Sequence, residues 1–332
     1  MGSFTPSPHK LTPSHHKLAV IDFTNQLENK TPNSTDSNWL IKCKDVTNAL
    51  EEYGCFIAVF DKVSPELDSA VFGAIEDLFN LPIETKIQNK EDKPLCGYVG
   101  PSPFTPLYEG LGTDFCTTPQ GIQKFTDVMY PEGNEDLSKI LLSYTQLVAE
   151  MEQTVLPMIF ESYGVKKNYD SHAKAVTYLF RATKYHTPNK NQTNVGLNSH
   201  TDKDFVTILH QNQVDGLEIR AKDGQWFSVE FPPSSYLVMA GEAAMAWSNN
   251  RMHAPYHRVT MDHGREARYS IAQFSFLEGM IETPEELVDE EHPLQYKPFN
   301  HIEFYTWFGS RVENHKLECA IRTYCGVSDN KS

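Results

Sequence analysis

The sequence predicts an α+β protein with a helical N-terminal region and a β-rich core of jelly-roll or barrel type. Three observations lead to this prediction. Apolar residues recur at helical spacing in the first half of the chain, and short β-rich runs separated by turn residues follow after Val176. The chain of 332 residues is also long enough to bury a sizeable core. We divide it into a mostly helical region, 1–165, and a jelly-roll region with C-terminal helices, 166–332.

Three helices are expected in the N-terminal region, over residues 37–53, 65–78 and 137–163. In the longest of them, Leu137, Leu141, Tyr144 and Val148 share one face. Such a stripe is typical of core packing rather than of cofactor binding. Gly164 suits the C-terminal cap of this helix, because glycine tolerates the left-handed conformation that often ends helices.

The C-terminal half contains β-rich runs at 205–209, 216–219, 226–229 and 236–240. Asp223-Gly224 is a turn signal that predicts a hairpin between the second and third of these runs. Short strands with turns between them are typical of a jelly roll or barrel. Further on, Thr283-Pro284-Glu285-Glu286 resembles a capping box and predicts the start of another helix.

His200 and Asp202 indicate a metal site. Residues i and i+2 of an extended strand face the same way, so the imidazole and the carboxylate should converge. Two histidines and one carboxylate form the facial triad that holds Fe(II) in non-haem oxygenases, whereas zinc more often takes cysteine or a third histidine. His253 and His257 compete for the third position. Pro255 argues against a helix there and His257 opens a strand-like run, so we choose His257 and interpret His253 as a loop residue near the site.

A strand is predicted over residues 268–276, with Arg268 and Ser270 on one face. A buried guanidinium without an anionic partner is costly, and bidentate pairing with a carboxylate removes that cost. We interpret Arg268 and Ser270 as the site for the distal carboxylate of 2-oxoglutarate. An internal ion pair with Asp or Glu is the alternative, and the position of Arg268, 11 residues after His257, argues against it.

These three motifs, at 200–202, 257–259 and 268–270, resemble those of plant 2-oxoglutarate- and Fe(II)-dependent dioxygenases. The resemblance extends over nearly the whole chain, from 18–23 to 324–327. Segments 97–100, 106–110 and 285–293 are similar to the AOP-type branch, which includes glucosinolate side-chain oxygenases and has relatives acting on steroidal alkaloids and auxin. The resemblance implies a double-stranded β-helix with iron at its open mouth.

The segment 179–185 departs from the family pattern at one position. Many members carry an asparagine before the tyrosine that binds the keto acid. The alignment we favour places Thr183 at the asparagine and Tyr185 at the tyrosine. The resemblance thus implies that the Tyr185 hydroxyl binds 2-oxoglutarate, with a core tyrosine as the alternative. Arg181 would then lie near the substrate pocket, unless it is a solvated charge on the strand.

Three aromatic residues are the remaining candidates for substrate contact. Phe274 and Phe276 follow Arg268 on the same strand face, where plain core packing is the alternative. Tyr108 belongs to a segment that would form a loop over the mouth or an ordinary surface loop.

Composition restricts the partners. The 29 basic and 44 acidic residues give a formal net charge of −15, which disfavours nucleic acid and anionic membrane surfaces. No apolar run approaches a membrane span. The six cysteines are scattered without a CxxC pair, as is typical of reduced thiols in the cytosol. We therefore expect a cytoplasmic monomer that acts on a small molecule.

These observations predict an enzyme that uses Fe(II), 2-oxoglutarate and O2 to oxidise a small specialised metabolite or hormone, releasing succinate and CO2. Hydroxylation is the default outcome, while desaturation, demethylation or ring formation needs only a different substrate pose. One alternative is an iron-dependent oxidase that does not use 2-oxoglutarate. Another is a non-catalytic binding or sensing protein, which a lost metal ligand would favour; none is lost.

Overall fold

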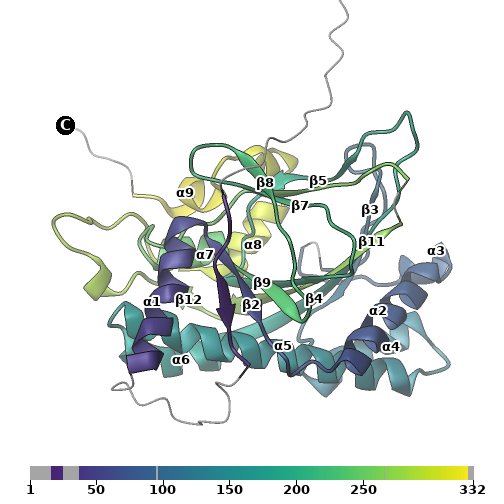
Figure 1. Cartoon of the computed structure of the whole chain (residues 1–332), viewed down its shortest axis with the longest axis horizontal. Coiled ribbons are helices and arrows are strands. Elements are labelled where there is room, and N and C mark those ends of the chain that lie inside the picture. The colour runs from purple at the N-terminus through teal and green to yellow at the C-terminus, as the bar shows by residue number, and fades with distance from the viewer. Residues whose placement is uncertain (1–15, 25–36, 95, 265, 328–332) are drawn as a thin grey trace, which may run out of the picture.

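The computed structural model describes residues 16–24, 37–94, 96–264 and 266–327. It mixes helices and sheets, with the longer helices in the N-terminal half as predicted (Figure 1). The α-helices are α1 (Ser37–Glu52), α2 (Pro65–Asn80), α3 (Ile83–Lys86), α4 (Pro119–Met129), α5 (Glu135–Ser162), α6 (Tyr169–Ala175), α7 (Glu242–Trp247), α8 (His301–Gly309) and α9 (Ala320–Cys325). Short 3-10 helices are η1 (Lys166–Asn168), η2 (Glu285–Leu287) and η3 (Val312–Lys316).

Helix α5 has well-defined ends that the sequence explains. At its start the Asn134 side chain accepts a hydrogen bond of 2.9 Å from the N–H of Leu137, which satisfies a backbone donor without a helical partner. At its end Gly164 has a φ of +70°, and the Val165 N–H bonds the Phe160 carbonyl at 2.9 Å. This geometry is a Schellman motif, so the predicted glycine cap is confirmed.

Most strands belong to two sheets. The larger has the order β1-β2-β9-β6-β11-β4-β3 and the smaller β5-β10-β7-β8. The strands of the larger sheet are β1 (Val20–Asp22), β2 (Cys55–Val59), β9 (Ser235–Ala240), β6 (Val206–Gln211), β11 (Arg268–Leu277), β4 (Val176–Tyr185) and β3 (Tyr108–Thr113). Those of the smaller sheet are β5 (Val195–His200), β10 (His257–Thr260), β7 (Leu217–Arg220) and β8 (Trp226–Ser228), and a separate pair is β12 (Met280–Ile281) with β13 (Phe299–Asn300).

The larger sheet buries both of its faces, and β9 shows how. Tyr236 and Val238 pack in the core that the sheet shares with the helices, whereas Leu237 and Met239 pack in a second core with residues of the smaller sheet. Successive side chains of a strand point to opposite faces, so one strand contributes to both cores. Helix α5 runs along the outer face of the larger sheet, where it contacts β6 and β11 (Figure 1).

The register between β4 and β11 places the predicted site residues side by side. Arg268 is the partner of Tyr185, and Ser270 is the partner of Thr183. Strand β3 pairs with the other edge of β4, so that Tyr108 lies opposite Tyr185. Three strands therefore bring Arg268, Tyr185 and Tyr108 to one end of the larger sheet, whereas Phe274 and Phe276 lie toward its other end.

Two local predictions had different outcomes. The Asp223-Gly224 hairpin between β7 and β8 is confirmed, with a φ of +87° at Gly224. The helix predicted from the capping box at 283–286 is wrong: only the single 3-10 turn η2 forms, without a side-chain cap. The reason is that the Thr283 hydroxyl donates to the Ala246 carbonyl at 3.0 Å, a partner outside its own segment.

The N-terminal region contributes β1, β2 and β3 to the larger sheet, so the two predicted regions share one sheet; the boundary at residue 165 stays a prediction. The six cysteines are free thiols, as expected. None of the helices in the described ranges combines the length and apolar character that crossing a bilayer requires.

Candidate metal centre and co-substrate site

The structure brings His200, Asp202 and His257 together. One ligand atom from each lies within 4.8 Å of the others. Both Nε2 atoms are 3.7 Å from Oδ1 of Asp202, and the two imidazole centroids are 4.2 Å apart. His257 reaches this position because it pairs with His200 across β5 and β10. His253 is not part of the group, which agrees with the choice of His257.

The convergence of His200 and Asp202 has a different cause from the one predicted. His200 is the last residue of β5, and Asp202 lies beyond the end of the strand. The position of Asp202 depends instead on a long-range contact, in which its carbonyl accepts a hydrogen bond of 2.9 Å from the backbone N–H of Glu242. The prediction that both residues lie on one strand and face the same way was therefore wrong, although the two side chains do meet.

Backbone carbonyls fix the orientation of both imidazoles. Nδ1 of His200 lies 2.8 Å from the Asn198 carbonyl, and Nδ1 of His257 lies 3.3 Å from the Pro255 carbonyl. Each Nδ1 must therefore carry the proton, since a carbonyl can only accept. The lone pair of each ring is then on Nε2, the atom that faces Asp202. This is the tautomer that a histidine needs to bind a metal through Nε2.

The local electrostatics keep the group in a metal-binding state. Burial, and then the neighbouring His257, lower the pKa of His200, so that its ring is neutral near pH 7. Burial alone would raise the pKa of Asp202, but the two imidazoles and the Thr207 hydroxyl, 2.6 Å from Oδ2, outweigh burial and lower it. A carboxylate with two imidazoles fits the donor set of Fe(II).

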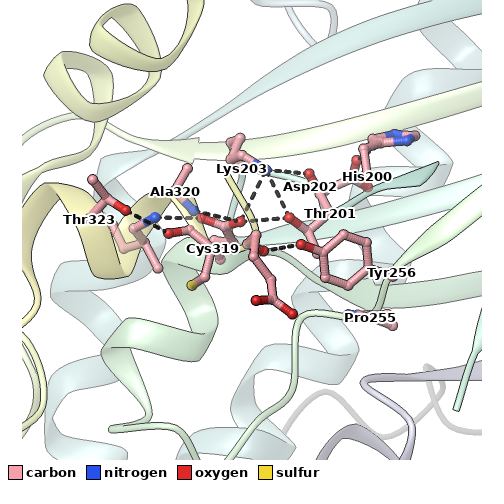
Figure 2. Close-up of polar contacts among 12 residues, drawn as sticks. His200, Thr201, Asp202, Lys203, Pro255, Tyr256, Cys319, Ala320 and Thr323 are labelled. Atoms are coloured by element: carbon pink, nitrogen blue, oxygen red, sulfur yellow. Dashed lines mark hydrogen bonds and ion pairs between the residues drawn. The ribbon is translucent and has the colours of Figure 1, made fainter. Parts of the chain in front are cut away.

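A second layer of polar contacts, shown in Figure 2, ties this segment to the C-terminal helix. The Thr201 hydroxyl donates to the Glu242 carboxylate at 2.6 Å, and the Lys203 ammonium lies 3.1 Å from the same carboxylate. Glu242 also accepts from the N–H groups of Ala320 and Ile321, at the start of α9. This network positions the metal-binding segment, and the sequence analysis did not find it.

Arg268 lies at the start of β11 and is completely buried. One terminal nitrogen donates to the Gln211 amide oxygen at 2.8 Å. Within the part of the chain that the structure describes, its Nε and Nη1 have no hydrogen-bond partner, and the Asp215 carboxylate, which acts on it electrostatically, forms no ion pair with it. The predicted alternative of an internal ion pair is therefore absent from these residues. A buried cation with free donors fits an anionic ligand.

Tyr185 and Ser270 lie next to this guanidinium. The Arg268 guanidinium carbon is 5.0 Å from the centre of the Tyr185 ring. The Ser270 hydroxyl is 3.1 Å from that of Thr183. Burial raises the pKa of Tyr185 to about 12, so its hydroxyl keeps its proton and can donate it to a carboxylate.

Two glycines leave space for Tyr185 and Arg268 next to β10, the strand that carries His257. A Cβ at Gly196 would lie 2.8 Å from the Tyr185 ring, and a Cβ at Gly216 would lie 3.3 Å from the Arg268 side chain. Both positions also face Val259, which lies two residues after His257 and on the same side of β10. Tyr185 and Arg268 thus occupy space beside the strand that carries the second histidine.

The predicted substrate residues have different environments. Arg181 is buried rather than solvated, and its Nε donates to the Tyr108 hydroxyl at 2.7 Å. Phe276 packs against His301 and Tyr305 with ring centroids 5.0 and 4.8 Å away, as core residues do, while Phe274 is half-buried beside it. Tyr108 is the first residue of β3 rather than part of a surface loop.

Comparisons with known proteins agree with this geometry. A family model described as the 2OG-Fe(II) oxygenase superfamily matches residues 171–276, and one described as the N-terminal region of a non-haem dioxygenase in morphine synthesis matches residues 18–106. The chain is 43% identical over 300 residues to the probable 2-oxoglutarate-dependent dioxygenase AOP1.2 of Arabidopsis thaliana, a match that covers 88% of this chain and 91% of that protein. The chain therefore belongs to the 2-oxoglutarate- and Fe(II)-dependent dioxygenases, which are oxidoreductases.

More distant relatives and solved structures also match most of the chain. The 2-oxoglutarate-dependent dioxygenase AOP3 of Arabidopsis thaliana is 29% identical over 403 residues, covering 92% of this chain and 97% of its own. Among solved structures, the dioxygenase for auxin oxidation 1 of the same plant, in a binary complex with 2-oxoglutarate, superposes with a TM-score of 0.73 at 29% identity, over 83% of this chain and all of that chain. The dioxygenase for auxin oxidation of rice gives a TM-score of 0.76 at 26% identity, over 94% of this chain and all of that one.

Proposed function

We propose that this enzyme hydroxylates a small specialised metabolite or hormone, with 2-oxoglutarate converted to succinate and CO2. His200, Asp202 and His257 bind Fe(II), while Arg268, Ser270 and Tyr185 bind 2-oxoglutarate. The observation that carries the proposal is the completely buried Arg268, which has free donors and lies near β10, the strand that carries His257. Iron and 2-oxoglutarate together supply the oxidising chemistry when they are bound.

The residues of the chain do the positioning. Arg268 offers two free nitrogens, Nε and Nη1, as donors to the distal carboxylate, and the Ser270 and Tyr185 hydroxyls add donors next to it. Because Gly196 and Gly216 leave room for Tyr185 and Arg268, the co-substrate is directed toward the side of β10 that carries His257. No side chain has to act as a nucleophile or general acid, since the metal and co-substrate supply the redox chemistry.

Desaturation, demethylation and ring formation use the same site with another substrate pose. The AOP-type and auxin-oxidising relatives support a small-molecule substrate for this chain. We also infer that the two facing sheets form the double-stranded β-helix of the family, with flanking helices. The free thiols and the acidic net charge support a cytoplasmic protein without nucleic-acid or membrane partners, which we propose to be a monomer.

The experiment that tests the proposal is anaerobic titration of the Fe(II)-loaded protein with 2-oxoglutarate, followed through the visible metal-to-ligand charge-transfer band. We expect a saturable band in the wild type that is lost or greatly weakened in Arg268→Ala. Arg322→Ala, which removes an exposed arginine of α9, serves as the matched control and should titrate like the wild type. Iron binding without any band would instead favour the oxidase that does not use 2-oxoglutarate.

A further inference from the structure

Arg181 is a second buried guanidinium without a charged partner. It lies on β4 and is 8% exposed, with Nε bound to the Tyr108 hydroxyl at 2.7 Å. Within the described ranges, its Nη1 is buried and has no hydrogen-bond partner, and no carboxylate lies within ion-pair distance. Among the described residues, the ionisable side chains that act on Arg181 are Tyr108, Tyr305 and Cys96, and none of them is a carboxylic acid.

Other buried cations of this protein do have carboxylate partners. Lys86 lies 2.6 Å from Glu109, and Lys203 lies 3.1 Å from Glu242. A buried charge is costly unless it is paired, so this pattern is the expected one. Arg181 and Arg268 are exceptions to this pattern, because neither buried guanidinium forms an ion pair with a carboxylate among the described residues. If Arg268 is left unpaired because a ligand carboxylate completes it, the same explanation applies to Arg181.

The neighbouring strand makes room for this guanidinium. A Cβ at Gly110 would lie 2.7 Å from Nη2 of Arg181 and 2.8 Å from the Tyr108 hydroxyl. A larger residue on β3 would therefore displace the side chain from its contact with Tyr108. The glycine and the tyrosine, from the same strand, together hold the guanidinium in one place.

Arg181 also lies on the correct face to act near the metal. It shares its face of β4 with Thr183 and Tyr185, and its Cα lies four positions before that of Tyr185, about 13 Å along the strand. Tyr305 of α8 lies within electrostatic range of both Arg181 and Asp202. Arg181 is thus on the same side of the sheet as the metal centre, and its backbone lies further along β4 than that of Tyr185, the partner of Arg268.

We propose that Arg181, held by Tyr108, binds a carboxylate group of the primary substrate, so that this enzyme selects small carboxylic acids. This inference rests on the proposed function, because it assumes that Arg268 is occupied by 2-oxoglutarate. A carboxylate fits this site, since a single guanidinium carries one positive charge and can bind a carboxylate through two parallel hydrogen bonds. Arg181 is a specificity residue and takes no part in the chemical step.

The test compares acids with their neutral amides by anaerobic calorimetry of the protein saturated with Fe(II) and 2-oxoglutarate. The probes are benzoate, phenylacetate and indole-3-acetate, each paired with its primary amide. Saturating 2-oxoglutarate blocks Arg268, so that any preference for the acid comes from elsewhere. For at least one pair, we expect the acid to bind about tenfold or more tightly than the amide. This preference should be lost in Arg181→Met and partly kept in Arg181→Lys.

Arg322→Met is the matched control and should keep the preference of the wild type, since Arg322 is exposed. Tyr108→Phe, which leaves the guanidinium charged but releases its Nε, should lower the preference without abolishing it. Equal binding of acid and amide in every pair, or no binding of any acid at about 10 mM, would overturn the proposal. So would an acid preference that persists in Arg181→Met.

The 2-oxoglutarate charge-transfer band separates this inference from the proposed function. If the band forms normally in the wild type and in Arg181→Met while acids are not preferred, only the role of Arg181 is wrong. If the band is absent from the wild type, the proposed function itself has failed. Normal band formation in Arg181→Met also shows that the variant is folded around its metal centre.

Discussion

Tyr185 and Arg268 are partners in the β4–β11 register, and the guanidinium carbon lies 5.0 Å from the centre of the tyrosine ring. The ring covers one face of a buried cation that has free donors, so it contributes apolar enclosure and cation–π attraction in addition to its hydroxyl. The contribution of the ring can be separated experimentally from that of the hydroxyl, because phenylalanine keeps the ring and removes only the hydroxyl.

Tyr185→Phe is expected to weaken 2-oxoglutarate binding about tenfold, the effect of losing one hydrogen bond to a charged group. The thermal unfolding temperature should change little, because the ring and its packing are preserved. Anaerobic titration of the charge-transfer band gives the affinity. Tyr178→Phe, at another buried tyrosine of β4, is the control. An unchanged affinity in Tyr185→Phe would remove the hydroxyl from the co-substrate site.

Asp202→Ala is expected to abolish iron-dependent turnover while the protein stays folded. The variant loses the one carboxylate among the three converging ligands, and two neutral imidazoles alone bind Fe(II) weakly. Iron content after gel filtration and 2-oxoglutarate-dependent succinate formation are the measurements. Asp127→Ala, on the exposed face of α4, should behave like the wild type. Turnover that survives in Asp202→Ala would show that the metal is bound elsewhere.

Glu242→Ala should destabilise the protein by about 3–5 kcal/mol, since it leaves the buried Lys203 ammonium without a counter-charge. The Thr201 hydroxyl and two N–H groups of α9 lose their acceptor as well. Urea unfolding of the metal-free protein measures the change. Glu135→Ala, whose ion pair with Lys139 is almost fully exposed, should cost no more than about 0.5 kcal/mol. A similar small loss in Glu242→Ala would exclude an important role for this network.

The sequence made some of these residues predictable and not others. Asp202 and Arg268 could be predicted because short motifs specify their residue types and spacing. Glu242 could not, because its partners Thr201 and Ile321 are far away in the sequence and no periodicity links them. A glutamate at the start of the otherwise apolar segment 242–247 was the one local signal of a buried acid.

Element types were predicted better than their details for a related reason. Apolar periodicity reports which face is buried, and it was sufficient for α5 and for the strands that follow Val176. It does not report side-chain hydrogen bonds to distant segments. This is why the capping box at Thr283 was misread, and why Arg181, a charged residue in a strand, could not be assigned to the buried face. The charge of Arg181 became informative only when its surroundings were known.

The buried carboxyl group of Glu152 should make the free energy of unfolding depend on pH. This residue of α5 is completely buried, and among the described residues neither of its carboxylate oxygens has a hydrogen-bond partner. Burial raises its pKa to about 8, while the nearby Ser275 hydroxyl opposes the shift. An unfolded glutamate has a pKa of about 4.3. Between these two values the folded state keeps a proton that the unfolded state has lost.

The sign of the effect follows from proton linkage. Because the unfolded state binds fewer protons between about pH 4 and pH 8, the free energy of unfolding contributed by Glu152 falls as the pH rises through that range. Glu152→Gln removes this titration. Relative to the wild type, the variant should therefore gain up to about 1.4 kcal/mol per pH unit until the difference levels off near pH 8.

Urea unfolding of the metal-free proteins at a series of pH values from 5 to 9 measures this difference, with a chelator present so that the metal ligands titrate equally in both. Buried histidines such as His172 and His301 titrate in both proteins and cancel from the comparison. Glu135→Gln, at an exposed position, should follow the wild type at every pH. A stability difference between Glu152→Gln and the wild type that is independent of pH would mean that Glu152 is already ionised in the folded protein. In that case an unseen cation or a water must compensate its charge, because an unpaired carboxylate could not stay buried there.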